Sequence, residues 1–132
     1  MDPLNSAEQT KTILVVEDNP MITLLLVRQL EHAGHKVVTA GDAILGAKMC
    51  AQYRPDLVLL DLMIPAGGGI SVLRQLRRSV YTNNTPVLVL TASNDAAARK
   101  QLLEFGVHLF IKKPHDPKEL LAFIRQATHA PL

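Results

Sequence analysis

The sequence has no tryptophan, a single cysteine, and aromatic residues at only 4% of its positions. One cysteine cannot form an internal disulfide, and Cys50, with no histidine beside it, is expected to be a small buried hydrophobe. So few aromatic side chains leave no base-stacking surface for nucleic acid. The 14 Lys and Arg barely exceed the 12 Asp and Glu, so we expect no direct nucleic-acid or membrane partner.

Long apolar stretches are also absent. The longest apolar runs are far too short to span a bilayer. The opening residues 1–10 are polar and lack the apolar core of a signal peptide, so a cytoplasmic protein is expected. Arg74, Arg77 and Arg78 would lie close together on one helix, and a solvated helix face is the favoured interpretation of this cluster.

What the chain does have is an alternating pattern. Its 132 residues, 48% of them apolar, suit one compact domain. Short apolar runs occur at residues 13–16, 37–39, 57–60, 87–90 and 109–111, each followed by a segment with helical spacing. Unbroken apolar runs indicate strands that are buried on both faces, as in a parallel sheet. Five strand–helix units predict a doubly wound α/β fold with a five-stranded parallel sheet and helices on both faces.

Cap and turn residues mark several helix ends. Asn19 or Asp18 can cap the first helix, with Pro20 at its opening position. Gly34 and Gly106 stand where the first and fourth helices should end in a left-handed residue. We expect the folded domain to cover residues 11–129, with a flexible N-terminal tail at 1–10 and a C-terminal tail at 130–132.

Polar residues follow four of the five predicted strands. In chain order they are Glu17 and Asp18, Asp61, Thr91, and Lys112 with Lys113. The carboxyl ends of parallel strands lie at one edge of the sheet, where such folds place their sites. Asp61 stands out because it closes a buried run and is followed by more apolar residues. A carboxylate there is costly unless it meets a cation or hydrogen-bond donors.

Three carboxylates crowded together repel one another and should attract a hard divalent cation, most naturally Mg²⁺. With the cation held, one carboxylate can attack a phosphoryl group. The metal and Lys113 would neutralise the transferring oxygens, and Thr91 could hydrogen-bond one of them. The product would be an aspartyl phosphate.

In this order and spacing, the segments VVEDNP, DLMIP, TA and KKP resemble the response-regulator receiver family of two-component signalling, including its chemotaxis regulators. The resemblance covers about residues 11–128. It implies a flavodoxin-like sheet with strand order 2-1-3-4-5. It also implies a bacterial phosphoprotein that receives its phosphoryl group from a histidine kinase or histidine phosphotransfer protein and controls an output partner that the sequence does not identify.

The resemblance assigns roles to individual residues. Asp61 would be the phosphoacceptor and, together with Asp18, a direct Mg²⁺ ligand. Glu17 would bind the ion through water, and the backbone carbonyl of Met63 would complete the protein ligands. Lys113 corresponds to the family's lysine because it directly precedes a proline, and its bond to that proline should be cis.

The switch residues also follow from the resemblance. Thr91 would be the switch hydroxyl and Phe110 the switch aromatic, and the output surface would comprise the fourth helix, the fifth strand and the fifth helix. Two departures stand out. Phe110 replaces the frequent tyrosine and lacks its hydroxyl. Gly68 and Gly69 stand where the family often has Asp-Gly, and the glycines at residues 67–69 favour a flexible loop after Asp61 rather than a phosphate cradle.

Several alternatives stay open or are disfavoured. The chain could be a stand-alone regulator, or a receiver module of a hybrid kinase or multidomain regulator. An aspartate-nucleophile phosphatase is disfavoured because Met63 stands where such enzymes carry a second Asp. A flavodoxin-like electron carrier is disfavoured because Glu17 and Asp18 would repel the FMN phosphate, and no G-x-G-x-x-G supports a dinucleotide fold. We therefore expect no enzyme activity beyond self-phosphorylation and dephosphorylation.

Overall fold

A computed structural model describes residues 10–64, 67–92, 96–107 and 109–128. The strands are β1 (Thr12–Val16), β2 (Lys36–Ala40), β3 (Leu57–Leu60), β4 (Val87–Thr91) and β5 (Leu109–Lys112). The helices are α2 (Pro20–His32), α3 (Ala43–Tyr53), α4 (Gly68–Arg78), α5 (Ala96–Glu104) and α6 (Pro117–Thr128). The tails expected at 1–10 and 130–132 lie outside the described residues, apart from Thr10.

The strands form one parallel sheet in the order β2-β1-β3-β4-β5. This confirms the fold class and the strand order. The chain adds β2 on one side of β1 and β3 on the other, so the order reverses between β1 and β3. In an open parallel sheet, a crevice forms at this reversal, outside the carboxyl ends of the strands.

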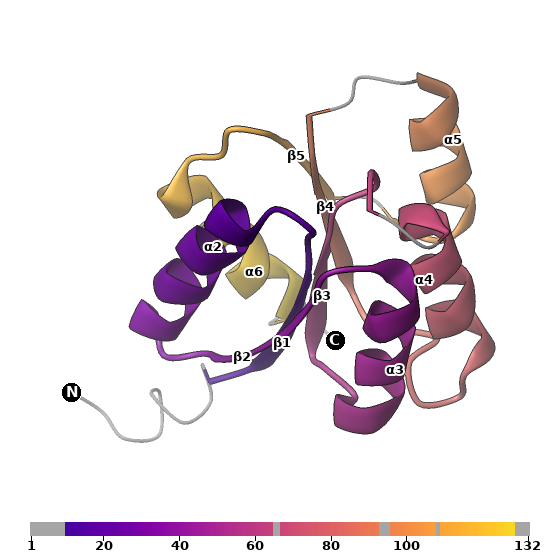
Figure 1. Ribbon diagram of the computed structural model, residues 1–132, viewed down its shortest axis with the longest axis horizontal. Coiled ribbons are helices and arrows are strands. Elements are labelled where there is room, and N and C mark those ends of the chain that lie inside the picture. Colours follow the sequence, from indigo (N-terminus) through magenta and orange to yellow (C-terminus); the bar gives the residue numbers. More distant parts are fainter. Residues whose placement is uncertain (1–9, 65–66, 93–95, 108, 129–132) are drawn as a thin grey trace.

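Helices cover both faces of the sheet, with α2 and α6 on one side and α3, α4 and α5 on the other (Figure 1). Successive strand residues serve the two faces in turn. In β1, Leu14 and Val16 pack with the α3–α4–α5 layer, whereas Ile13 and Val15 pack with α2 and α6. Each fully buried Leu or Ile side chain contributes about 1.5–3 kcal/mol. The two apolar layers explain why the strands read as unbroken apolar runs.

The start of α2 fixes the position of the acidic pair that precedes it. The Asn19 side chain accepts hydrogen bonds from the backbone N–H groups of Met21 (2.9 Å) and Ile22 (3.2 Å), and Pro20 opens the helix. Asn19 is therefore the cap, one of the two residues that the sequence allowed. Because the helix begins here, Glu17 and Asp18 are held at the carboxyl end of β1.

Cys50 lies in α3 with only 3% of its surface exposed. Burial raises the pKa of its thiol to about 12, so the thiol stays protonated at neutral pH and has little nucleophilic character. The interpretation of Cys50 as a buried hydrophobe is confirmed.

The arginine cluster of α4 differs from its prediction. Arg74 and Arg78 are exposed, but Arg77 is half-buried. Its guanidinium donates hydrogen bonds to the backbone carbonyls of Phe105 (2.8 Å), Thr85 (2.8 Å), Asn83 (3.1 Å) and Thr82 (3.4 Å). The prediction of a solvated face is therefore wrong for Arg77. Loop carbonyls that converge beside the end of α4 need donors, and that convergence is not visible in the local sequence.

The glycines at residues 67–69 have a role at the start of α4. Gly67 and Gly68 adopt positive φ angles of 112° and 73°. Gly69 is buried, and its N–H donates to the Leu62 carbonyl at 3.1 Å. A Cβ atom at Gly69 would lie 3.0 Å from both the Asp61 carbonyl oxygen and the Leu62 Cα. Glycine at position 69 thus lets the first turn of α4 pack directly against the backbone that follows β3.

Gly69→Ala should lower the free energy of unfolding by about 1–3 kcal/mol, because the new methyl group meets backbone atoms that cannot move aside. Urea titration followed by circular dichroism measures the change. Gly41→Ala is the matched control, since a Cβ atom there meets nothing within 4 Å. Equal losses in the two variants would contradict the steric explanation.

Candidate functional site

Three acidic residues from two strands meet at the carboxyl edge of the sheet. Glu17 and Asp18 follow β1, and Asp61 follows β3. Each offers a carboxylate oxygen, and these oxygens lie within 4.8 Å of one another. Glu17 and Asp61 are only 4% and 7% exposed, whereas Asp18 is exposed to solvent. The cluster therefore has two buried members and one that solvent can reach.

Lys113 supplies the positive charge between the two buried acids. It follows β5, and its ammonium donates to Asp61 Oδ2 at 3.0 Å and to Glu17 Oε1. Its backbone N–H donates to the Thr91 carbonyl at 3.0 Å, and its bond to Pro114 is cis, as the resemblance implied. Its neighbour Lys112 is exposed. The structure thus brings Lys113, which follows the edge strand β5, to carboxylates that follow β1 and β3.

The charges at the site depend on burial and on these hydrogen bonds. Burial raises the pKa of Glu17, and the nearby Asp61 charge adds to the rise, while hydrogen bonds from Lys113 and the Asn19 N–H (3.1 Å) oppose it. For Lys113, burial alone lowers the pKa, but its bonds to Glu17 and Asp61 outweigh burial and the net pKa is raised. Lys113 therefore remains an ammonium ion at neutral pH.

Asp61 is held from both sides. Its backbone N–H donates to the Val16 carbonyl at 3.0 Å, which ties it to β1. The Met63 backbone N–H donates to Oδ1 at 3.0 Å, and Lys113 donates to Oδ2 at 3.0 Å. The Met63 side chain itself is 73% exposed. With one donor on each oxygen, the carboxylate has a fixed orientation.

The two residues expected to form the switch lie on neighbouring strands. Thr91 is buried at the carboxyl end of β4, beside Lys112 of β5. Phe110 lies further down β5, half-buried against the α3–α4–α5 core layer. The Arg99 guanidinium lies over its ring, 5.2 Å from the ring centre. Thr91 thus lies at the same edge of the sheet as the acidic cluster, whereas Phe110 lies on the face of the sheet that α5 covers.

The donor set suits a hard divalent cation. Carboxylate oxygens are the ligands that Mg²⁺ and Ca²⁺ prefer, whereas sites for softer metals use Cys or His. A cavity of about 570 Å³ lies beside α2 and β2, and Glu17 and Asp18 form part of its wall. The acidic cluster therefore offers a chemically suitable site that is open on the side of Asp18.

Comparison with known proteins identifies the family. The model of the response regulator receiver domain matches residues 13–125. The chain belongs to this family, the receiver domains of two-component response regulators.

The curated relatives are longer proteins. The DNA-binding dual master transcriptional regulator RpaA of Synechocystis is 40% identical over 113 residues, which cover 86% of this chain and 47% of RpaA. The phosphate regulon transcriptional regulatory protein PhoB of Escherichia coli is 39% identical over 115 residues, which cover 87% of this chain and 50% of PhoB. The chain thus spans about half the length of the curated relatives it matches.

Solved structures share the fold. The receiver domain of the sensor histidine kinase PA1611 from Pseudomonas aeruginosa, solved with a magnesium ion in its active site cleft, superposes with a TM-score of 0.84 at 26% identity, covering 92% of this chain and 99% of that one. The BeF3-activated N-terminal receiver domain of RstA from Klebsiella pneumoniae has a TM-score of 0.80 at 31% identity, covering 89% of this chain and 97% of that one.

Lys113→Met should lower the free energy of unfolding at neutral pH without divalent cations by about 3 kcal/mol, because it leaves the buried carboxylates of Glu17 and Asp61 without their shared cation. Urea titration in EDTA measures the loss. Lys112→Met, at the exposed neighbouring position, should cost less than about 0.5 kcal/mol. A loss at Lys113 as small as that at Lys112 would show that the ion pairs contribute little.

Proposed function

We propose that this chain is a phosphoacceptor receiver domain that takes a phosphoryl group onto Asp61 from a phosphohistidine of a histidine kinase or phosphotransfer protein. One observation carries the proposal. The Asp61 carboxylate is buried and oriented by two donors, the Met63 N–H and the Lys113 ammonium, beside two further acids within 4.8 Å. An oriented carboxylate with an adjacent cation is the arrangement that nucleophilic attack on phosphorus requires.

In the transfer step, an oxygen of Asp61 attacks the phosphorus atom. The phosphorus–nitrogen bond of the donor histidine breaks, and its electron pair returns to the imidazole. The product is a mixed anhydride of carboxylate and phosphate. Lys113 already lies between Asp61 and Glu17, so its ammonium can neutralise an oxygen of the incoming phosphoryl group without a large movement. Thr91, buried at the end of β4, supplies a hydroxyl at the same edge.

The acidic cluster would hold Mg²⁺, with Asp18 and Asp61 as direct ligands, Glu17 acting through water, and the Met63 carbonyl completing the set. Bound there, the ion would neutralise charge on the transferring oxygens. Asp18 is exposed, which suits direct ligation of an ion that arrives from solvent. The magnesium in the PA1611 receiver domain supports the assignment.

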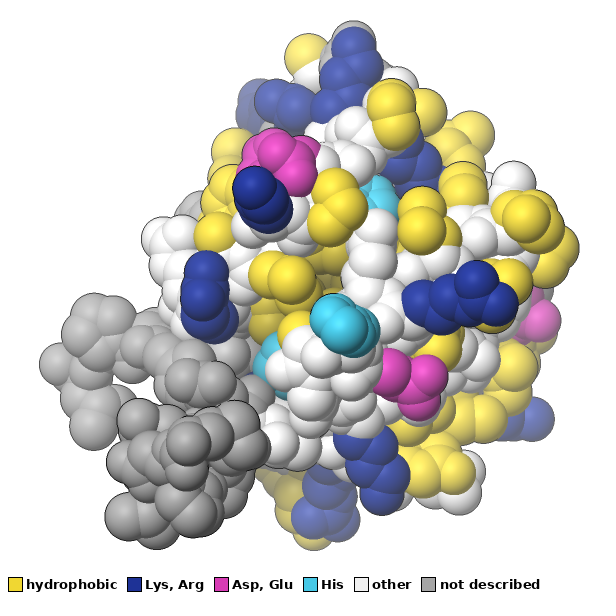
Figure 2. Space-filling model, turned by 90° about the vertical axis from the view of Figure 1, so that its left-hand side faces the viewer, with side chains coloured by type: hydrophobic (Ala, Val, Ile, Leu, Met, Phe, Trp, Pro, Cys, Tyr) yellow, Lys and Arg dark blue, Asp and Glu magenta, His cyan; other side chains and the backbone are white. Residues whose placement is uncertain are grey.

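A protein donor would approach beside α2. The face formed by α2 and α6 shows hydrophobic side chains among charged ones (Figure 2). On α2, Met21, Leu24 and Leu25 are 72%, 45% and 49% exposed. Helix α2 begins directly after the acidic pair. An apolar strip next to the phosphoacceptor suits the burial of a partner's surface and supports transfer from a protein.

Phosphorylation would alter the face formed by α5, β5 and α6. Thr91 would hydrogen-bond the new phosphoryl group, and Phe110 would turn further inward from its half-buried position against Arg99. Phe110 has no hydroxyl, so packing alone would fix the inward state. The change biases an existing equilibrium between two states.

The protein that uses this switch could be a stand-alone regulator or one with an attached output module, and the chemistry at Asp61 would be the same. RpaA and PhoB are named as transcriptional regulators, which favours control of an attached module. No helix in the described part of the chain is long and apolar enough to cross a membrane. A turnover phosphatase is disfavoured, because the second position after Asp61 carries Met63, which cannot act as a general acid.

Incubation with acetyl phosphate and Mg²⁺ should add one phosphoryl group to the chain, because Asp61 is oriented for attack. Intact mass spectrometry measures the gain, and EDTA should prevent it. Asp61→Asn should not gain the mass. Asp56→Asn, an exposed acid at the opposite end of β3, serves as the matched control and should be labelled like the parent. Labelling of Asp61→Asn would refute the assignment.

Mg²⁺ affinity should fall more in Asp18→Ala than in Glu17→Ala, since a direct ligand contributes more than one that acts through water. Isothermal titration calorimetry with MgCl₂ gives the order. Glu31→Ala, an exposed acid near the opposite end of α2 from Asp18, controls for loss of one negative charge. Equal affinity in the parent and in both site variants would remove the metal-site assignment.

Beryllofluoride should change hydrogen exchange in α5 and around Phe110, because Thr91 transmits the phosphoryl mimic to β5. The change should shrink in Thr91→Ala, which lacks the hydroxyl, and persist in Thr39→Ala at an exposed position of β2. Exchange followed by mass spectrometry resolves these segments. A response confined to the segment after Asp61 would mean that the domain stores phosphate without switching this face.

A further inference from the structure

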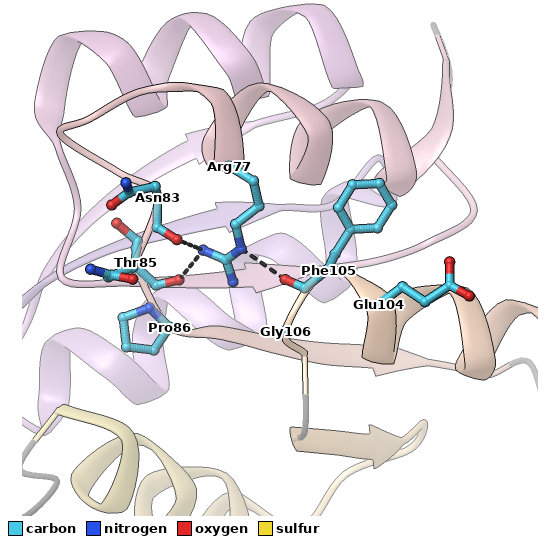
Figure 3. Close-up of a pocket in the computed structure, with 8 residues that line it drawn as sticks. Arg77, Asn83, Thr85, Pro86, Glu104, Phe105 and Gly106 are labelled. Atoms are coloured by element: carbon cyan, nitrogen blue, oxygen red, sulfur yellow. Dashed lines mark hydrogen bonds between the residues drawn. The ribbon is translucent and has the colours of Figure 1, made fainter.

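A second cavity lies at the opposite edge of the sheet from Asp61. It has a volume of about 570 Å³, and its walls come from the end of α4, the segment before β4, and the turn between α5 and β5 (Figure 3). Asp61 and Lys113 follow the ends of strands, whereas this cavity adjoins the beginnings of β4 and β5. No residue of the proposed phosphoryl site lines this cavity, so the cavity is separate from that site.

Arg77 presents an unused edge to this cavity. Its Nε donates to the Phe105 carbonyl, and its Nη1 donates to carbonyls of the segment before β4, including Thr85 at 2.8 Å. Its Nη2 donates to none of the described residues and points between Pro86 and Gly106 (Figure 3). A Cβ atom at Gly106 would lie 4.0 Å from Nη2, so glycine leaves this edge uncovered.

The charge of Arg77 has no anionic counterpart among the described residues. The ion pairs found there both involve Lys113, and the partners of Arg77 are neutral carbonyls. Burial lowers the pKa of Arg77, as expected for a cation without a paired anion, although a guanidinium stays charged at neutral pH. A half-buried cation with two free N–H donors gains charge-assisted hydrogen bonds when an oxyanion binds.

The other walls favour one kind of anion. The side chains of Asn83 and Asn84 can donate hydrogen bonds, and Pro86 adds an apolar surface. Glu104 also lines the cavity, with its carboxylate turned away from Arg77 in Figure 3, and its charge disfavours a dianion such as phosphate. We propose that this cavity binds a small organic monocarboxylate, whose carboxylate accepts hydrogen bonds from Arg77 Nη2 and whose apolar part contacts Pro86.

Titration of the ¹⁵N-labelled chain with isobutyrate, followed by NMR at constant ionic strength, tests the proposal. The backbone amides of Thr85, Phe105 and Gly106 should shift and saturate, with a dissociation constant of about 1 mM. Formate, without the apolar part, and inorganic phosphate, with its second charge, should bind more weakly. Shifts that do not saturate, or that sodium chloride reproduces, would overturn the proposal.

Variants make the assignment specific. Arg77→Lys should weaken isobutyrate binding about tenfold or more, because it removes the planar donor edge, whereas Arg74→Lys on the exposed face of α4 should bind like the parent. If Arg77→Lys is not folded at the titration temperature, Glu104→Gln decides the question. Glu104→Gln should strengthen the binding of inorganic phosphate several-fold, and an unchanged affinity for phosphate would overturn the proposed site. Asp61→Asn should bind isobutyrate normally, which separates this inference from the proposed phosphoacceptor role.

Discussion

Two buried carboxylates, those of Glu17 and Asp61, share the ammonium group of Lys113, and the geometry of the site depends on this arrangement. Desolvated carboxylates so close together would be strongly unfavourable without a cation. The three residues follow β1, β3 and β5, which are far apart in the chain. The strand order β2-β1-β3-β4-β5 places Asp61 between the other two, so the lysine can reach both acids.

The same arrangement connects stability with the proposed chemistry. In the resting state, Lys113 balances two acids, while the third, Asp18, remains exposed. An arriving phosphoryl group brings oxygens that compete for the same ammonium. A site that holds its charges in place needs little reorganisation when the reaction begins. The cost is a cluster of acids that a protein selected for stability alone would avoid.

A parallel sheet also separates the two ends of the molecule chemically. At the carboxyl edge, side chains that follow the strands converge and form the acidic cluster. At the amino edge, backbone carbonyls of the segments leading into β4 and β5 converge on Arg77. The first edge is rich in side-chain acceptors for cations. The amino edge holds the guanidinium of Arg77, whose Nε and Nη1 donate to neutral carbonyls while its Nη2 donates to none of the described residues.

The sequence by itself determined the fold class, because strands buried on both faces must be continuously apolar, and it placed Glu17, Asp61 and Lys113 at one edge through their positions after strands. The strand order came from the family resemblance. Tertiary structure alone decided that Arg77 is half-buried, that Gly69 packs against the backbone after β3, and that Lys113 binds Glu17 as well as Asp61. These contacts depend on how helices, strands and loops pack against one another, so no local spacing or propensity encodes them.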